Sequence, residues 1–231
     1  LKGQLFLIDK PMGWSSFHVV NKIRWHLKNR SGLKKLKVGH AGTLDPLATG
    51  LLLICTGQKT KSIETYQKQE KEYVGKLFLG ATTLSYDLET NRDYSYPTEH
   101  ITHQHILDMS KQFTGEIEQY PPLFSALKKE GKRLYKYARE GLKPEIKPRH
   151  ILISEFKIEK IKLPEVEFLV RCSKGTYIRS LAHDFGKALQ SGSHLISLRR
   201  TKIGAFSIED SYHMNSFYDE NSPKNIRLNL N

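Results

Sequence analysis

Cysteine is scarce in this chain of 231 residues, and long apolar runs are missing. The two cysteines, Cys55 and Cys172, lack C-x-x-C spacing and both lie in apolar, strand-like contexts. We therefore expect buried free thiols in a reducing cytosol. No stretch approaches the ~18 apolar residues of a membrane-spanning helix, and no signal-peptide pattern opens the chain. The sequence thus predicts a cytoplasmic protein with no membrane partner.

Acidic residues are also in short supply, with 24 Asp and Glu against 37 Lys and Arg and a net charge of +13. A solvated basic surface that aids solubility is one interpretation of this surplus. A surplus of this size is more typical of a protein that binds a polyanion, and nucleic acid is the usual one. The hydrophobic content of 38% excludes a disordered tail and allows a proper core, in one large domain or in one domain with a small appendage.

Several signatures of known chemistry are absent. No segment fits the phosphate-binding pattern G-x-x-x-x-G-K-[ST], the G-x-S-x-G elbow or a cysteine-nucleophile pattern. His100, His103 and His105 lie close together in sequence, but no Cys, Asp or Glu stands at matching metal-ligand spacing. We expect these histidines to lie at the solvated start of a helix, and we expect no metal.

Apolar periodicity predicts a mixed α/β fold in which strands and helices alternate only loosely. Helices are expected to begin after a cap at Ser15 or Ser16, after Thr102 and after Thr176. Strands are expected over residues 5–8, 51–55, 73–79, 151–161, 166–172 and 195–206. Residues 121–150 differ in character, because Pro-Pro is followed by Lys and Arg interleaved with tyrosines, and they indicate a mobile basic insertion.

The stretch from Gly39 to Gly50 holds one imidazole, His40, and one carboxylate, Asp45, in a loop punctuated by glycines. An apolar run follows at once, and a loop fixed by a buried strand is where chemistry tends to be displayed. Asp45 precedes Pro46, however, and Asp-Pro commonly opens a turn or a short helical segment. Both interpretations of Asp45 stay open on these residues alone.

A second candidate segment runs from Ser173 to Arg179. With Thr176 as a helix cap, Lys174 and Arg179 would stand at the positive end of the helix, where cations are disfavoured by a few tenths of a kcal/mol or more. An anion opposite them would explain their presence. We hypothesise that Arg179 pairs with Asp45 and holds it ionised in a fixed orientation. A bridge from Arg179 to any other nearby Asp or Glu is the structural alternative.

Tyr73 and Tyr177 each lie near an expected strand end, where a core role is the default for an aromatic residue. The functional alternative is a platform for a stacked nucleobase, worth about 1–3 kcal/mol per base. A basic cluster at the end of the first helix and in the loop after it allows two interpretations as well, a cationic helix end or a set of phosphate contacts. Its members are Lys28, Arg30, Lys34, Lys35 and Lys37.

Six blocks, in order, resemble the TruB family of tRNA pseudouridine synthases, and one alone would be only suggestive. They are residues 8–16 (IDKPMGWSS), 39–50 (GHAGTLDPLATG), 71–73 (KEY), 119–128 (QYPPLFSALK), 172–181 (CSKGTYIRSL) and 198–201 (LRRT). The resemblance implies a pseudouridine synthase fold, in which a mixed, mostly antiparallel central β-sheet is flanked by helices. It implies a catalytic domain over residues 1–210, with residues 121–150 as an RNA-clamping insertion. Residues 211–231 would form a short polar tail in place of the PUA domain that many members carry.

The resemblance also implies the activity, the isomerisation of uridine 55 in the T-loop of tRNA to pseudouridine, with neither cofactor nor metal. The expected partner is the T-arm stem-loop of tRNA, bound by a monomeric, bacterial-type enzyme. Asp45 falls on the position of the family's catalytic aspartate, Tyr73 on that of the tyrosine that stacks against the target base, and Arg179 on that of the arginine that pairs with the aspartate.

The remaining correspondences concern RNA binding. His40 matches the histidine that takes part in displacing the base, and Tyr177 and Leu198 match positions that line the pocket. The basic residues that we assign to RNA contacts are Lys10, Lys128, Lys174 and Arg199.

The chemistry that the resemblance implies agrees with the residues. The target uridine must leave its stack before a side chain can reach it, and an ionised carboxylate can then form a covalent intermediate. Attack on the base, attack on the ribose and removal of a sugar proton are all open at this point. Two other functions also stay open, a non-catalytic tRNA-binding or folding module and a basic hydrolase that uses Asp45 with His40.

Overall fold

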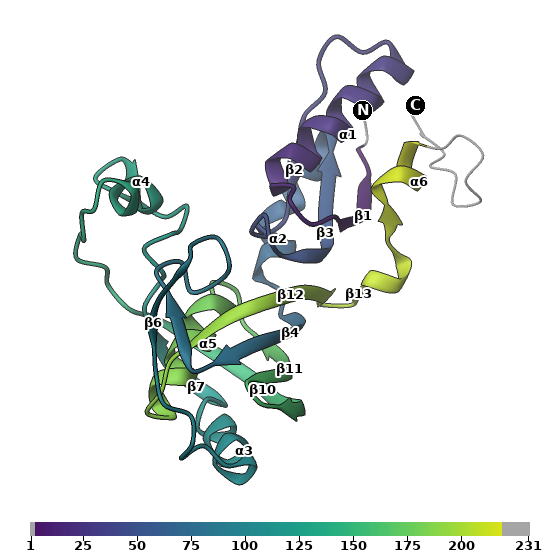
Figure 1. Cartoon of the computed structure of the whole chain (residues 1–231). Coiled ribbons are helices and arrows are strands. Elements are labelled where there is room, and N and C mark those ends of the chain that lie inside the picture. Colours follow the sequence, from purple (N-terminus) through teal and green to yellow (C-terminus); the bar gives the residue numbers. More distant parts are fainter. Residues whose placement is uncertain (1–2, 219–231) are drawn as a thin grey trace. The chain divides into compact units, whose positions relative to one another are not determined.

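A computed structural model describes residues 3–218 of the chain, and these residues form two compact units (Figure 1). Unit 1 comprises residues 3–73 and 198–218, and unit 2 comprises residues 74–197. Two strands, β4 (Lys71–Leu79) and β12 (Ser193–Ile203), run along the chain from one unit into the other. Residues 219–231, the larger part of the expected polar tail, lie outside the described residues.

Unit 1 is built from both ends of the chain. Besides its portions of β4 and β12, its elements are β1 (Leu5–Lys10), α1 (Ser16–Ser31), β2 (Val38–His40), β3 (Thr49–Thr56), η1 (Gly57–Ser62), α2 (Ile63–Lys68), β13 (Phe206–Ser207), η2 (Ile208–Asp210), β14 (Tyr212–His213) and α6 (Met214–Tyr218).

Strand β3 is the centre of unit 1. One edge pairs antiparallel with β1, from Leu5 opposite Cys55 to Lys10 opposite Gly50. The other edge pairs antiparallel with β2 at one end and parallel with β12 at the other, where Arg200 faces Gly50. Because β3 has neighbours on both edges, its whole backbone is held in register, and the loop that precedes it is fixed at that end.

Both faces of β3 are covered, which explains why its sequence is an unbroken apolar run. Leu52 and Ile54 belong to a core cluster with the inner side chains of α1, among them Val20 and Ile23. Leu51 and Leu53, on the opposite face, pack in a second cluster with Ile203 and residues of α2. The expected helix after Ser15 is confirmed, since the Ser15 side chain accepts from the His18 N–H and caps α1.

The described part of the expected polar tail packs on unit 1. Tyr212 and His213 form β14, which lies parallel to β1. Met214 and Phe217 of α6 are buried in the α1 cluster, where the Phe217 ring meets that of Phe6 edge-on at 5.5 Å. Residues 211–218 therefore complete the core of unit 1, and the polar composition of the segment conceals its two buried apolar side chains.

Unit 2 contains the middle of the chain. Besides the rest of β4 and β12, its elements are β5 (Ala81–Thr83), β6 (Arg92–Ser95), α3 (His103–Gln112), β7 (Gly115–Gln119), β8 (Lys128–Lys129), β9 (Lys132–Arg133), α4 (Leu134–Arg139), β10 (Arg149–Lys162), β11 (Glu165–Cys172) and α5 (Ile178–Ala188). The main strands run side by side in the order β12-β4-β11-β10-β7.

An aromatic cluster joins the sheet of unit 2 to two helices. The rings of Phe113 after α3, Phe156 of β10, Phe168 of β11 and Phe185 of α5 meet edge to face at centroid distances of 5.3–6.4 Å. This is a favoured geometry for aromatic pairs, worth about 0.5–1.5 kcal/mol per pair beyond burial. Phe185 thereby anchors α5 to the sheet of unit 2.

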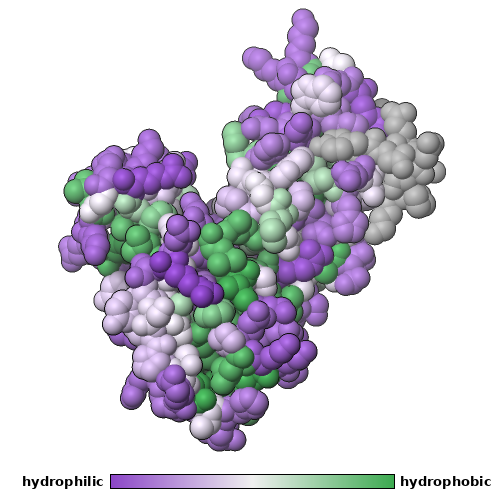
Figure 2. Space-filling model, viewed as in Figure 1, coloured by the Kyte–Doolittle hydropathy of each residue, from purple (hydrophilic) through white to green (hydrophobic). Residues whose placement is uncertain are grey.

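The expected basic insertion, residues 121–150, contains the β8–β9 hairpin and α4. Hydrophilic residues cover most of the visible surface around α4 in Figure 2. The Leu134 side chain is buried, and its N–H donates to the Leu127 carbonyl at 2.8 Å. The segment thus has a small anchor of its own beneath an exposed basic exterior.

The mixed, mostly antiparallel sheet flanked by helices is confirmed, with β1–β14 and β3–β12 as parallel pairs. Cys55 and Cys172 are both buried free thiols, as predicted. The expected strand over 195–206 is instead broken, because β12 ends at Ile203 and turns at Gly204 into β13. Within residues 3–218, no helix has the length and apolar character that a membrane crossing requires.

We predict that Gly50→Ala destabilises the protein far more than Gly32→Ala. Both glycines have positive φ, +105° and +66°, so alanine is strained at each. A Cβ at Gly50 would also strike the backbone carbonyl oxygen of Arg200, whereas a Cβ at Gly32 meets nothing within 4 Å. We expect a loss of about 1 kcal/mol in the free energy of unfolding for Gly32→Ala and at least about 3 kcal/mol for Gly50→Ala, measured by urea denaturation. Equal losses would contradict this account.

Candidate functional site

The candidate loop, residues 39–50, connects β2 to β3 in unit 1 and is tied to α1 by a reciprocal pair of hydrogen bonds. The Ser16 hydroxyl donates to the Leu44 carbonyl at 3.0 Å and accepts from the Leu44 N–H at 2.8 Å. At the other side the Ala41 N–H donates to the Leu53 carbonyl at 2.9 Å. One buried hydroxyl at the start of a helix therefore fixes the residue next to Asp45.

A buried guanidinium, that of Arg200, lies beneath the same loop with only 1% of its surface exposed. Its Nε donates to the Leu51 carbonyl at 2.8 Å, while Nη2 donates to Gly42 at 3.2 Å and Nη1 to Thr43 at 3.4 Å. Three backbone carbonyls of the loop and the strand after it thus converge on one side chain. Since an arginine cannot lose its proton in a protein, the positive charge here is permanent.

A second buried cation, Lys10 at the end of β1, also contacts the loop and has no exposed surface. Its ammonium donates to the carbonyls of Trp14 at 2.7 Å, Pro11 at 2.9 Å and Pro46 at 3.4 Å. Burial lowers the pKa of Lys10 to about 8, although Asp45 opposes the shift; Arg200 lowers the pKa further, and Asp9 opposes it. The residue therefore remains largely protonated at neutral pH and adds positive charge close to Asp45.

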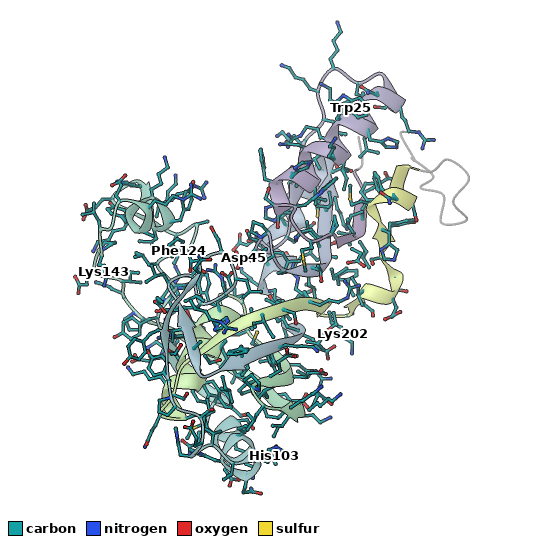
Figure 3. The ribbon with its side chains drawn as sticks, in the orientation of Figure 1. Trp25, Asp45, His103, Phe124, Lys143 and Lys202 are labelled. Atoms are coloured by element: carbon teal, nitrogen blue, oxygen red, sulfur yellow. The ribbon has the colours of Figure 1, made fainter. Side chains whose placement is uncertain are left out.

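Asp45 lies at the turn of this loop and is half-buried (Figure 3). The Ala48 N–H donates to its carbonyl at 3.1 Å, so the Asp-Pro sequence does open a turn, as the structural interpretation predicted. The turn uses the backbone of Asp45. The Asp45 carboxylate interacts electrostatically with the Lys10 ammonium. This interaction favours the protonated form of Lys10. The two interpretations of Asp45 are therefore compatible.

Tyr73 of β4 is 8% exposed and belongs to the same unit. The Arg200 guanidinium carbon lies 5.9 Å from the centroid of its ring, at the outer limit of a cation–π contact. Arg200 therefore links the ring of Tyr73 to the loop that carries Asp45, and it does so through contacts within unit 1 alone.

His40 ends β2 and is half-buried. Burial lowers the pKa of His40, and Arg200 lowers it further, although the backbone of Gly42 opposes the shift. The imidazole is consequently neutral at pH 7. A neutral ring can stack or accept a hydrogen bond without adding a third cation to the neighbourhood of Lys10 and Arg200.

Arg199 pairs with Asp9, the neighbour of Lys10. The two guanidinium nitrogens lie 3.0 and 2.7 Å from the two carboxylate oxygens, which is a bidentate pair. His213 of β14 also approaches Asp9, with Nδ1 at 3.3 Å from Oδ2. The Arg199 side chain keeps 39% of its surface exposed, so it is both an anchor for β1 and part of the surface.

Arg179 lies in the first turn of α5 in unit 2, and its side chain is buried. Its Nη1 donates to the Ser85 carbonyl at 3.0 Å, and its Nε lies 3.6 Å from Asp87 Oδ2. These contacts agree with the alternative in which Arg179 bridges to another nearby acid. The expected pair with Asp45 joins residues of different units, so it stays a prediction.

The start of α5 differs from the expectation. Thr176 does not cap the helix, because its hydroxyl donates to the Ser173 carbonyl at 3.0 Å and the cap position is Tyr177. The buried side chain of Gln119 instead accepts from the Tyr177 N–H at 2.8 Å and donates to the Tyr177 carbonyl at 3.0 Å. A residue 58 positions away thus fixes the backbone of the cap residue, and the Tyr177 side chain itself makes no capping hydrogen bond.

The loop between β5 and β6 shapes the environment of Arg179. The Ser85 hydroxyl accepts from the Thr90 N–H at 3.1 Å and donates to the Asp87 carbonyl at 3.2 Å. Asp87 Oδ1 accepts from the Glu89 N–H at 2.9 Å. Since these groups are satisfied within the loop, the Ser85 carbonyl and the second oxygen of Asp87 are held at fixed positions for Arg179.

The other expected RNA contacts fall in two classes. Lys128 and Lys174 are exposed, while Tyr177 and Leu198 are half-buried. Lys128 also lines a groove of the insertion together with Lys147 and Arg149. Lys10 differs from all of these, because its ammonium is enclosed by three carbonyls. A direct phosphate contact for Lys10 is therefore incompatible with its position in the structure.

Sequence reasoning missed the structural roles of Arg200, Ser16, Asp87 and Gln119. Arg200 belongs to the block at residues 198–201, which we used only for the family resemblance. The arginine pair at positions 199 and 200 was the one sequence feature that could have drawn attention to it. Asp87 and Gln119 act through contacts across 92 and 58 positions, from Asp87 to Arg179 and from Gln119 to Tyr177, and no local pattern announces such contacts.

Family models match nearly the whole chain. One described as the TruB family pseudouridylate synthase N-terminal domain matches residues 28–178. A second, described as the tRNA pseudouridylate synthase B C-terminal domain, matches residues 179–226. Among curated relatives, tRNA pseudouridine synthase B of Flavobacterium johnsoniae is 60% identical and covers 94% of this chain and 95% of its own. The relative of the same name from Phocaeicola vulgatus is 52% identical, over 94% and 92%.

Solved structures give the same result for the fold. A chain of the Cbf5–Nop10–Gar1 complex has a TM-score of 0.71 at 30% identity and matches 93% of this chain. A chain of an H/ACA ribonucleoprotein bound to a substrate RNA that contains 2′-deoxyuridine has a TM-score of 0.67 at 28% identity. The present chain spans about half the length of these two solved chains, 53% and 52%.

We predict that Lys10→Met removes a pH dependence of stability between pH 8 and pH 10.5. In the native protein Lys10 loses its proton near pH 8, whereas in the unfolded chain it keeps the proton to about 10.5. Between these values the unfolded state binds more protons, so stability owed to this residue rises with pH, by about 3 kcal/mol in total. Urea denaturation of both proteins from pH 7.5 to pH 10.5 measures the difference. Parallel curves would show that the buried amine does not titrate there.

Proposed function

The chain belongs to the TruB family of pseudouridylate synthases, and on that premise we propose that it converts uridine 55 in the T-loop of tRNA to pseudouridine. The T-arm stem-loop is its RNA partner. Like the expectation from the sequence, the proposal takes the enzyme to be a cytoplasmic monomer that uses neither metal nor cofactor.

The reaction is an isomerisation that consumes no co-reactant. The bond between N1 of uracil and C1′ of the ribose breaks, and a bond between C5 and C1′ forms in its place. The proton lost from C5 is balanced by the proton that N1 gains. The protein must therefore supply a nucleophile or base, a pocket in which the detached uracil can turn, and shelter from water.

The single observation that carries the proposal is the placement of Asp45 on a loop fixed by two buried cations. Arg200 binds three carbonyls of the loop and the adjoining strand, and Lys10 binds the carbonyl of Pro46. The Lys10 ammonium, which Asp45 favours electrostatically, thus gives the proposed catalytic carboxylate a cationic neighbour at the same loop. In this proposal Asp45 is the catalytic residue.

Arg179 orients Asp45 in the proposal, and Asp87 orients Arg179. A guanidinium that already donates to the Ser85 carbonyl and approaches Asp87 has lost much of its rotational freedom. Such an arginine can hold a carboxylate at a fixed angle without a further entropic cost on substrate binding.

Tyr73 and His40 act on the nucleotide. Loop nucleotides are the cheapest to extrude from a stack, and an aromatic ring can receive the base that leaves it. We assign the stacking surface to Tyr73 and the displacement of the base to the neutral imidazole of His40. Tyr177 and Leu198 complete the apolar lining of the pocket.

The exposed basic residues hold the RNA backbone. Lys128 and Lys174 supply phosphate contacts, and the exposed part of Arg199 adds another while its guanidinium stays paired with Asp9. Lys10 is withdrawn from this set and placed in the support of the loop. Phosphate contacts of this kind give affinity that falls with salt.

Asp45→Asn should abolish pseudouridine formation and leave tRNA binding within about threefold of the parent protein. The amide keeps the shape of the side chain but cannot act as a nucleophile or base. Release of tritium from T-arm RNA labelled at uridine C5 measures turnover, and filter binding measures affinity. Asp210→Asn, at an exposed carboxylate of the same unit, is the control. Turnover by Asp45→Asn would refute the catalytic role, and binding without turnover by the parent protein would leave a tRNA-binding module.

Asp87→Asn should lower the rate at saturating RNA by about 10- to 100-fold with little change in RNA affinity, because the guanidinium of Arg179 loses the restraint that the Asp87 carboxylate supplies. Asparagine keeps the oxygen that accepts from the Glu89 N–H, so the loop should still fold. Single-turnover tritium release, with circular dichroism as a check of folding, tests this. A change in affinity alone would remove Asp87 from the positioning of Arg179.

A further inference from the structure

Acidic residues are missing from a long part of unit 1. Between Asp9 and Asp45 the sequence contains eight Lys and Arg and no Asp or Glu. Lys10 is buried, and Arg24 is engaged, since it donates to the Asn21 side chain at 2.8 Å and to the Val38 carbonyl at 3.1 Å. The remaining six cations lie on α1 or in the loop after it. They are Lys22, Lys28, Arg30, Lys34, Lys35 and Lys37.

The outer face of α1 carries large aromatic residues in the same region. Phe17 is 62% exposed and Trp25 is 65% exposed, although both belong to the residue types that folding normally buries. Trp25 is labelled on α1 in Figure 3. A concave surface runs along this face, lined by Ser15, Phe17, His18, Asn21, Lys22 and Trp25. We call this surface the α1 face.

Packing in the core does not account for these two exposed rings, because neither belongs to the α1 cluster. The opposite side of the helix, with Val20, Ile23 and Leu27, packs in the cluster beneath it. Phe17 and Trp25 are eight positions apart on one stripe, about 12 Å along the helix axis. One nucleobase cannot span that distance, so each ring offers a separate stacking surface.

We propose that the α1 face is a second RNA-binding surface, separate from the loop that carries Asp45. Unpaired bases stack on Phe17 and Trp25, while Lys22 and the basic cluster after the helix neutralise the phosphates between and beyond them. Aromatic residues interleaved with cations are the general design for single-stranded nucleic acid, and stacking accepts every base. The inference rests on the proposed function, because it assumes RNA as the natural partner.

Charge favours RNA over a second copy of the chain as the occupant of this face. Two copies of the chain docked through it would bring two cationic surfaces together, which costs affinity. A polyanion instead gains from every cation of the region by releasing its counterions. The occupant we commit to is therefore an RNA segment with unpaired bases, and the sequence of those bases is unimportant.

Trp25 provides a direct probe of this proposal. The chain has two tryptophans, so Trp14→Phe leaves Trp25 as the reporter. Titration of this variant with oligoadenylate, which offers no uridine to the Asp45 loop, should quench the fluorescence of Trp25. We expect the apparent affinity to fall steeply with salt, and Lys22→Gln should reduce the log–log salt slope by about 0.7.

Variants of the face should affect binding without affecting the chemical step. Phe17→Ala combined with Trp25→Ala should weaken oligoadenylate binding by about tenfold or more, equal to about 1.4 kcal/mol. The single-turnover rate of pseudouridine formation in T-arm RNA at saturation should be unchanged. Tyr94→Ala, at a ring of similar exposure (63%) in unit 2, is the matched control.

The outcomes separate this inference from the proposed function. Active enzyme with Trp25 unquenched by every RNA would overturn the α1 face alone. A quenched Trp25 in a protein that forms no pseudouridine would support the α1 face and refute the proposed function. If the alanine variant instead changes the sedimentation of the free protein and leaves RNA binding intact, the surface joins two copies of the chain and the inference is wrong. Should Trp14→Phe fail to fold, quenching lost in Trp25→Phe relative to the parent gives the same test.

Discussion

The Arg200 guanidinium holds unit 1 together at its functional loop. It lies in the interior, where an isolated charge would be very costly, and backbone carbonyls of residues 42, 43 and 51 compensate it. The backbone of the same residue pairs with Gly50, so closely that a side chain at position 50 would collide with it. Arg200 therefore holds β3 and the loop at residues 39–50 in fixed positions, and the position of Asp45 follows from that arrangement.

Two buried cations and a half-buried carboxylate form one group of interacting charges. Lys10 alone is destabilised by burial, as its lowered pKa records, and Asp45 and Asp9 offset part of that cost. Asp9 is held in turn by Arg199 in a bidentate pair. A group of this kind contributes little to net stability, because desolvation cancels much of the attraction. The group instead provides a fixed electrostatic field around the Asp45 carboxylate.

Much of the fold could be predicted because local pattern and tertiary burial agree. The apolar run of β3 and the helical spacing of Val20, Ile23 and Leu27 each describe what their element buries. The loop with Asp45 was also identifiable, since glycine, carboxylate and imidazole stand together in sequence. The predicted cap of α5 was wrong because the Thr176 hydroxyl donates to the Ser173 carbonyl, while Gln119, far away in the chain, holds the backbone of Tyr177 at the cap position. The burial of Lys10 and Arg200 was likewise invisible, since both residue types are normally exposed and only the folded loop supplies their carbonyl partners.

Unit 1 draws its elements from both ends of the polypeptide, and this has a consequence for biosynthesis. A ribosome releases residues 3–73 long before residues 198–218, so the nascent chain presents β3 and α1 without β12, β14 and α6. Until then Phe217 is missing from the cluster around Phe6, and the loop at residues 39–50 lacks its guanidinium. Translation must therefore pass residue 217 before this part of the molecule can mature, and a product that terminates early lacks the side chains that hold the loop of Asp45 and complete the core of unit 1.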